Sequence, residues 1–237
     1  MAKVKKATKT GLLISVKNAE EAVAAVKAGA TLIDVKDPLK GPLGMAPGDV
    51  VESVIAAVGA QVPVSAALGE WSPTILTEAV WHLELPLTYL KWGLAGYREA
   101  PGWGEDLLET RRAVPARMEV VAVAYADFAK AKSIPPAEVA KFAKRYRFKA
   151  FLLDTFLKDG KTLLNHMKLD EIVELVQMLR ENKVKVALAG SLTLEAAKKL
   201  LVAEPDWFAV RGAVCTGGKR GNDLDPGKVK KWKELVG

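Results

Sequence analysis

The amino-acid sequence predicts a single (β/α)8 barrel, the α/β architecture also called a TIM barrel. Short apolar segments alternate with amphipathic segments along the chain, a pattern typical of parallel βαβ units. Eight such units fit within the 237 residues, and a closed barrel of this type usually takes roughly 250 residues. An open, doubly wound sheet is the structural alternative. It is disfavoured because no G-x-G-x-x-G motif follows the first candidate strand.

The eight candidate strands are short and apolar on both faces. This is the composition expected of a parallel sheet that is covered on both sides. In chain order, the candidate strands span residues 11–16, 31–37, 62–68, 88–94, 119–125, 150–155, 184–190 and 207–213.

Helix signals fill the intervals between these strands. The first helix is expected over residues 18–29, because Asn18 is a favourable N-cap residue and Gly29 is favourable at a helix C-terminus. Two prolines open the helix expected over residues 135–146, and prolines are tolerated in a first turn. The other expected helices span residues 46–59, 72–83, 103–114, 168–182, 191–204 and 225–236.

The composition favours anionic partners, because the formal net charge is +7. The basic residues are spread over helix faces, no zinc-finger or RNA-binding signature is present, and no segment reads as a membrane span. Cys215 is the only cysteine, which suits a reducing compartment. We therefore expect a cytoplasmic homo-oligomer that binds a phosphorylated small molecule and neither nucleic acid nor membrane. Residues 11–237 are expected to form one catalytic domain after a flexible, basic lead-in over residues 1–10.

Five charged side chains fall where candidate strands end. Asp34 and Lys36 close the second strand and Lys91 lies in the fourth. Asp154 ends the sixth strand, and Lys158 follows in the loop after it. Strand ends carry the chemistry of α/β barrels. Because side chains alternate along a strand, Asp34 and Lys36 share one face, which in a barrel is the interior. The alternative is a structural ion pair that fills the end of the barrel.

Clustered amines suppress one another's protonation, and a neutral lysine is a nucleophile that forms an imine with an aldehyde or ketone. The five residues therefore predict carbonyl chemistry. Two effects compete at Lys36: an ionised Asp34 would raise the lysine pKa, whereas Lys91 and Lys158 would lower it. The residues alone leave this competition open.

The seventh and eighth strands are followed by small residues, Gly190 with Ser191 and Gly212 with Ala213, the latter pair directly after Arg211. Such loops expose main-chain N–H groups and are the recurrent phosphate site of barrel enzymes. We predict phosphate binding by these five residues. The alternative is that the glycines only form turns. The glycine-rich, basic segment CTGGKRGND that follows is expected to close over a phosphate.

Other polar residues predict less. His82 and His166 lack partners at metal-ligand spacing, so no metal site is predicted. Lys161 is expected to be a solvated charge, and Cys215 a packing residue. Asp127 is expected to be either a further polar contact of the site or a helix cap.

Six motifs occur in a characteristic order along the chain: LIDVKDPLKGPLG, YLKWGLAG, AYAD, LLDTFLKDGKTLL, LAGSL and RGAVCTGG. Together they resemble the (5-formylfuran-3-yl)methyl phosphate synthases, also called 4-(hydroxymethyl)-2-furancarboxaldehyde-phosphate synthases, over nearly the whole chain from about Gly11 onward. The resemblance implies a barrel of the class I aldolase type. It also implies a lyase that condenses two molecules of glyceraldehyde 3-phosphate into a phosphorylated furan aldehyde, with loss of phosphate and water. It implies no metal or organic cofactor, and a product used for methanofuran-type one-carbon carriers.

By the same resemblance, Lys36 matches the Schiff-base lysine and Lys91 the proton acceptor. Asp34, Asp154 and Lys158 match other active-site positions. Two alternatives stay open: another Schiff-base aldolase that acts on phosphorylated aldehydes, and a basic protein that binds nucleic acid. The second is disfavoured because the distinctive lysines lie in apolar strands rather than along a surface stripe.

Overall fold

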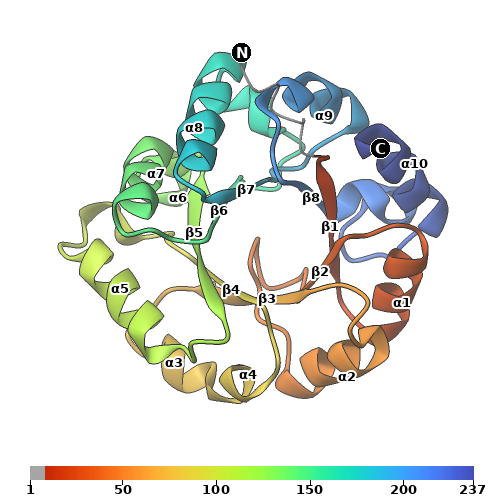
Figure 1. Cartoon of the computed structure of the whole chain (residues 1–237), viewed down its shortest axis with the longest axis horizontal. Coiled ribbons are helices and arrows are strands. Elements are labelled where there is room, and N and C mark those ends of the chain that lie inside the picture. Colours follow the sequence, from red (N-terminus) through yellow and green to blue (C-terminus); the bar gives the residue numbers. More distant parts are fainter. Residues whose placement is uncertain (1–8) are drawn as a thin grey trace, which may run out of the picture.

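The computed structural model describes residues 9–237, so most of the expected lead-in over residues 1–10 lies outside the described residues. Eight parallel strands follow one another around a closed barrel, and β1 pairs with both β2 and β8. The helices form an outer ring around these strands (Figure 1). The predicted fold class is confirmed.

All eight expected strands are present. Most end a little before the predicted limit, because the chain turns into the loops that line the barrel mouth. Strand β8, for example, stops at Val210, and the next residues form a short 3-10 turn. The strands are β1 (Gly11–Val16), β2 (Leu32–Val35), β3 (Val64–Glu70), β4 (Tyr89–Gly93), β5 (Glu119–Tyr125), β6 (Ala150–Asp154), β7 (Lys185–Leu188) and β8 (Trp207–Val210).

The main helices also lie where helix signals were found, with two differences. The helix expected over residues 72–83 is divided at Ala79 into α3 and α4, in a stretch where β-branched residues lower helix propensity. The short helix α6 was not predicted. The α-helices are α1 (Ala19–Lys27), α2 (Gly48–Val58), α3 (Ile75–Glu78), α4 (Val80–Glu84), α5 (Trp103–Ala113), α6 (Phe128–Ala131), α7 (Pro136–Arg145), α8 (Leu169–Glu181), α9 (Leu194–Leu200) and α10 (Pro226–Val236).

In the described part of the chain, five short 3-10 turns join these elements: η1 (Tyr97–Glu99), η2 (Leu163–Asn165), η3 (Leu201–Ala203), η4 (Gly212–Val214) and η5 (Thr216–Gly218). At the start of α1, the Asn18 side chain accepts a hydrogen bond from the main-chain N–H of Glu21 at 3.0 Å, so the predicted N-cap is confirmed. Between residues 9 and 237, no helix has the length and apolar character needed to cross a membrane.

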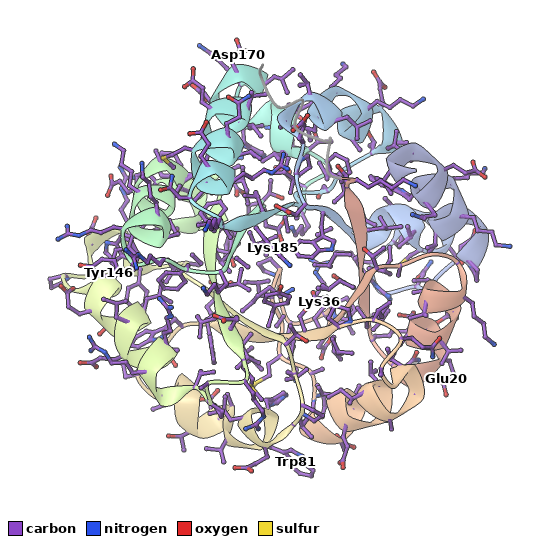
Figure 2. All side chains as sticks on the ribbon, in the orientation of Figure 1. Glu20, Lys36, Trp81, Tyr146, Asp170 and Lys185 are labelled. Carbon is purple, nitrogen blue, oxygen red and sulfur yellow. The ribbon has the colours of Figure 1, made fainter. Side chains whose placement is uncertain are left out.

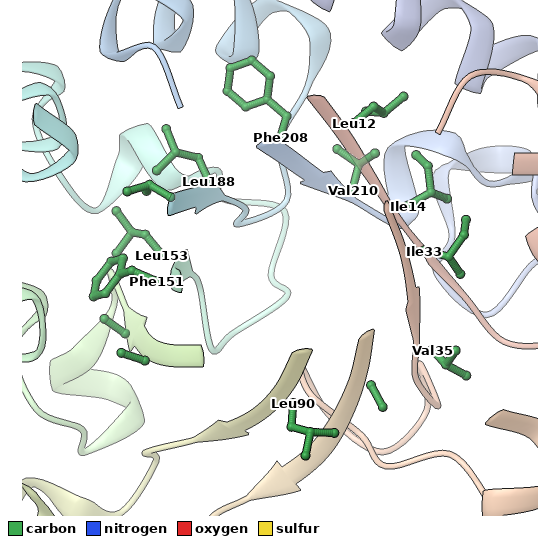
Figure 3. Close-up of a cluster of buried hydrophobic side chains, with 14 of the residues drawn as sticks. Leu12, Ile14, Ile33, Val35, Leu90, Phe151, Leu153, Leu188, Phe208 and Val210 are labelled. Atoms are coloured by element: carbon green, nitrogen blue, oxygen red, sulfur yellow. The ribbon is translucent and has the colours of Figure 1, made fainter. Parts of the chain in front are cut away.

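The core has two shells, because successive strand residues point to opposite faces. In β6, Phe151 and Leu153 belong to the shell between strands and helices (Figure 3). Leu152, between them, packs inside the barrel with small residues such as Ala67 and Ala187. These small interior side chains leave room at the carboxyl ends of the strands, where polar residues replace apolar ones.

Candidate active site

A cavity of about 370 Å³ opens at the carboxyl ends of the strands. All five charged residues singled out in the sequence line it: Asp34, Lys36, Lys91, Asp154 and Lys158. Lys36 lies toward the middle of the barrel in Figure 2. The structure therefore brings together side chains from three separate strands and their loops. Whether each residue has its expected chemical role stays a prediction.

Asp34 is the most firmly held of these groups. Its Oδ1 atom forms an ion pair with Lys91 Nζ and accepts a hydrogen bond from Ser65 Oγ at 2.8 Å. Its Oδ2 atom accepts from Ser15 Oγ at 3.1 Å. All four side chains are buried. Strands β1, β2, β3 and β4 each contribute one of them, so the barrel itself fixes the orientation of the carboxylate.

Lys36 is buried but forms no ion pair within residues 9–237. Its Nζ donates a hydrogen bond to the main-chain oxygen of Pro42 at 3.2 Å. Burial lowers the pKa of Lys36 to about 7, although Asp34 and Asp154 act to raise it; Lys158 and Arg220 add to the lowering. The sequence left open whether the pKa of Lys36 is raised or lowered, and in the structure burial makes the net change a lowering. A large fraction of this amine is neutral near neutral pH, as a nucleophile requires.

Asp154 and Lys158 form the second ion pair of the cavity, with 2.8 Å between Oδ1 and Nζ. Asp154 Oδ1 also accepts from the N–H of Thr155 at 2.7 Å. Burial acts to raise the pKa of Asp154, but the charges of Lys158 and Lys36 outweigh it and the net pKa is lowered. The carboxylate is therefore ionised near neutral pH.

Asp127 supports the loop that carries Lys158. Its carboxylate accepts hydrogen bonds from the N–H groups of Phe156 at 2.6 Å and Leu157 at 2.9 Å. It stands at the start of α6 but makes no side-chain cap there. Its contact is thus with the loop backbone, outside the cavity lining.

A further, half-buried carboxyl group, Glu70, was missed by sequence reasoning. It accepts hydrogen bonds from Tyr125 Oη at 2.6 Å and from the N–H of Ala95 at 2.9 Å, and burial raises its pKa. Gly93 gives it room, because a Cβ at that position would lie 1.9 Å from Glu70 Oε2. The sequence signal that could have identified Glu70 is its position as a carboxylate at the end of the third strand.

The loops after β7 and β8 form one wall of the cavity, and all five predicted phosphate-binding residues line it. Gly190 has a φ of 95° and Ser191 a φ of 48°, so both adopt the left-handed region. Within residues 9–237, the N–H groups of Gly190, Ser191, Gly212 and Ala213 donate to no main-chain carbonyl. Free N–H groups beside a cavity are suited to an anion.

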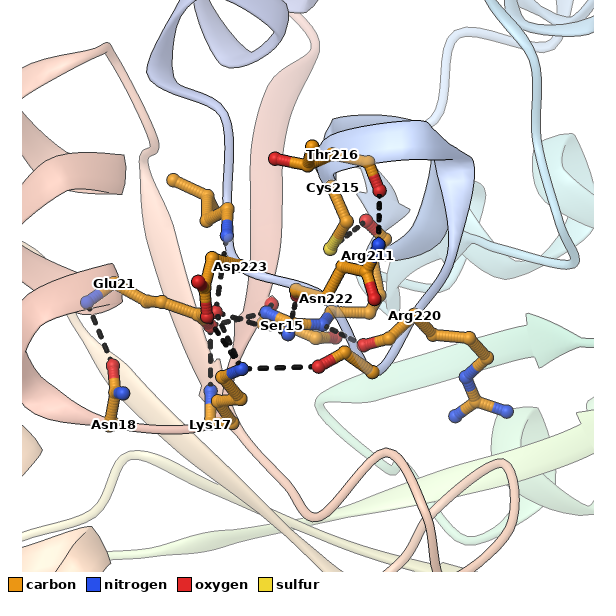
Figure 4. A network of polar contacts seen from close by, with 12 residues as sticks. Ser15, Lys17, Asn18, Glu21, Arg211, Cys215, Thr216, Arg220, Asn222 and Asp223 are labelled. Atoms are coloured by element: carbon orange, nitrogen blue, oxygen red, sulfur yellow. Dashed lines mark hydrogen bonds and ion pairs between the residues drawn. The ribbon is translucent and has the colours of Figure 1, made fainter.

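The side chain of Arg211 is directed away from this wall (Figure 4). Its guanidinium forms a buried ion pair with Glu21 and donates to the main-chain oxygens of Ser15, Arg220 and Asn222. These contacts occupy all five N–H groups of a guanidinium. The guanidinium of Arg211 is therefore not available to a phosphate, and only the main chain of Arg211 is still expected to contribute to phosphate binding.

Two of the remaining polar residues considered in the sequence, His82 and Cys215, are buried within the fold. His82 is buried with its Nε2 2.9 Å from the oxygen of Ala46. Cys215 is buried, and burial raises the pKa of its thiol. No group of three or more metal-ligating side chains occurs in the described part of the chain.

A closed barrel with lysines and carboxylates gathered at the carboxyl ends of its strands defines an aldolase-like barrel enzyme. The family model described as 4-HFC-P synthase matches residues 12–233, and the chain belongs to this family. A relative from Methanothermobacter thermautotrophicus, named (5-formylfuran-3-yl)methyl phosphate synthase, is 35% identical over 231 residues, which cover 95% of this chain and 98% of the relative. A relative of the same name from Methanococcus maripaludis is 34% identical over 233 residues, covering 95% and 97%.

Solved structures share the fold at low sequence identity. Thiamine phosphate pyrophosphorylase from Pyrococcus furiosus is similar with a TM-score of 0.64 and 13% identity, covering 97% of this chain and 96% of that one. Phosphoribosyl anthranilate isomerase from Thermus thermophilus is similar with a TM-score of 0.63 and 16% identity, covering 96% and 98%.

Proposed function

We propose that this enzyme condenses two molecules of glyceraldehyde 3-phosphate into (5-formylfuran-3-yl)methyl phosphate through a Schiff base on Lys36. The observation that carries the proposal is the buried, unpaired amine of Lys36, whose pKa is lowered to about 7 in a cavity with two further lysines and two carboxylates. The name of the relatives supports the choice of product. The reaction is that of a carbon–oxygen lyase acting on phosphates.

Lys36 attacks the aldehyde carbon of the first triose phosphate and forms an imine with loss of water. The protonated imine withdraws electrons and so eases loss of the proton from the neighbouring carbon. Lys91 accepts that proton once its own ammonium proton has passed to the carboxylate of Asp34, with which it forms an ion pair. The enamine can then expel the phosphate on the next carbon, which lies β to the imine carbon.

The two carboxylates serve the later steps, in which water leaves and the ring closes. Asp34 and Asp154 each lie beside a lysine, so each can pass a proton to or from the substrate at short range. Atom balance requires that two triose phosphates release one phosphate and two waters to give this furan. Lys158 and the main-chain N–H groups after β7 and β8 bind the phosphate groups in this scheme.

The test is to supply the pure protein with glyceraldehyde 3-phosphate alone and to analyse the products by mass spectrometry and ultraviolet absorbance. We expect the furan aldehyde phosphate, together with one inorganic phosphate per furan. Lys36→Met should form none, whereas Lys161→Met, in the exposed part of the neighbouring loop, should behave as wild type. An adduct trapped on Lys36 without formation of a furan would instead favour another Schiff-base aldolase.

The biological setting follows from the product. We propose that the furan enters the biosynthesis of methanofuran-type one-carbon carriers and that the enzyme works in the cytoplasm. The expected homo-oligomer stays a prediction that analytical ultracentrifugation checks. The alternative of nucleic-acid binding predicts an affinity that falls steeply with salt.

A further inference from the structure

The charges of the cavity do not cancel. Lys91 is paired with Asp34, and Lys158 with Asp154, so neither pair carries net charge. Lys36 is left without an ion pair, but its amine is partly neutral near neutral pH.

Among the lining residues that the structure describes, one permanent cation is left without an ion pair, the guanidinium of Arg220. Among residues 9–237, no carboxylate forms an ion pair with Arg220, and its side chain makes a single hydrogen bond, from Nη2 to the oxygen of Gly41 at 2.9 Å. Burial lowers the pKa of Arg220, and the charge of Asp154 acts in the opposite direction. A half-buried guanidinium without an acidic partner is a site that an anion would stabilise.

The backbone around Arg220 is fixed from the outside of the barrel. Arg211 donates from Nε to the main-chain oxygen of Arg220 at 2.8 Å, and Lys17 donates to that of Gly221 at 3.1 Å. The Arg220 side chain extends away from this network (Figure 4). Two neighbouring arginines thus have different roles: Arg211 holds the loop, and Arg220 presents free N–H groups at the cavity rim.

The partner of Arg220 connects it to the nucleophile. Gly41 and Pro42 are consecutive residues of the loop between β2 and α2. The oxygen of Gly41 accepts from Arg220, and the oxygen of Pro42 accepts from Lys36 Nζ at 3.2 Å. One short segment therefore contacts both Arg220 and the amine of Lys36.

We propose that Arg220 binds the phosphate group of the aldehyde substrate, exchanging the Gly41 carbonyl for phosphate oxygens, and that this exchange loosens the loop contact of Lys36. The proposal rests on the proposed Schiff-base function. A phosphate offers bidentate, charge-assisted hydrogen bonds, which a guanidinium forms better than the single contact to a carbonyl. Phosphate binding would thus both orient the aldehyde and release the amine that attacks it.

The test compares two aldehydes that differ only in the phosphate, glyceraldehyde 3-phosphate and glyceraldehyde, by the rate of borohydride-trapped adduct formation. Wild type should prefer the phosphorylated aldehyde. Arg220→Ala should lose on the order of ten- to a hundred-fold of the preference for the phosphorylated aldehyde, measured as the ratio of the two trapping rates, which is the loss expected of a charge-assisted contact. Arg220→Lys should recover part of the loss, because it restores the charge without the planar fork. Lys219→Ala, an exposed neighbour, is the matched control and should resemble wild type.

Inorganic phosphate tests the loop exchange separately. Added with glyceraldehyde, it should accelerate trapping by wild type but leave Arg220→Ala unchanged. An equal preference for the phosphorylated aldehyde in wild type and Arg220→Ala would overturn the phosphate-binding role. Absence of acceleration in wild type would overturn the exchange. Absence of any adduct in wild type would instead contradict the proposed Schiff-base function, so the two failures are distinguishable.

Discussion

Burial lowers the pKa of Lys36 more than its charged neighbours do. Because only the neutral amine attacks an aldehyde, the rate of adduct formation should rise with pH around a midpoint of about 7. Lys158 lowers the pKa of Lys36, so Lys158→Met should move the midpoint to higher pH. The unpaired Asp154 left behind would act in the same direction.

The measurement is the trapped adduct as a function of pH, with Lys161→Met as the control. The control should keep the wild-type midpoint, because Lys161 is exposed and is not among the charges that act on Lys36. An unchanged midpoint in Lys158→Met would mean that Lys158 does not act on the amine of Lys36.

Asp34 and Lys91 give a second prediction at the scale of single residues. Removing one partner of a buried ion pair leaves an uncompensated charge and typically destabilises by roughly 3–5 kcal/mol. Lys91→Met should therefore lower the free energy of unfolding by that order. The double variant Asp34→Asn, Lys91→Met should recover much of the loss, because no buried charge is then left unpaired. Denaturant unfolding at neutral pH measures both effects, and a double variant no more stable than Lys91→Met would contradict the account of this pair.

At the scale of elements, the sequence predicts which side chains of one strand and its following loop point toward the barrel mouth. The alternation of side chains predicts that Asp34 and Lys36 point the same way, and strand ends predict that Lys91 and Asp154 meet them. Ion pairs between residues far apart in the sequence are not predictable in this way. Arg211 pairs with Glu21, 190 residues earlier, because the last strand closes the barrel beside the first.

This closure makes a prediction for the segment between β8 and α10. Glu21→Ala leaves the buried guanidinium of Arg211 without its carboxylate, which should destabilise the protein by roughly 3–5 kcal/mol. It should also loosen the loop that carries Arg220, detected as faster proteolysis or hydrogen exchange of residues 215–224. Glu20→Ala, on the exposed face of the same helix, is the matched control and should stay within about 0.5 kcal/mol of wild type. Equal protection of the segment in both variants would exclude an anchoring role for Glu21.

At the scale of the whole molecule, the barrel was predictable because eight apolar strands and intervening helix signals repeat at a regular interval. One expected helix is divided at Ala79, in a stretch where β-branched residues lower helix propensity, so its bounds were not predictable. Glu70 and Arg220 show the same limit at the site. Each is an ordinary charged residue in sequence, and only the closed barrel determines whether it lies at the mouth.

The central claim is that a single neutral lysine at the mouth of this barrel bonds covalently to its aldehyde substrate. The most direct measurement is borohydride reduction of wild-type protein with glyceraldehyde 3-phosphate, followed by peptide mapping with mass spectrometry. The account predicts one adduct, on the peptide that contains Lys36, and none in Lys36→Met. An adduct located on Lys91 or Lys158, or one that persists in Lys36→Met, would contradict it.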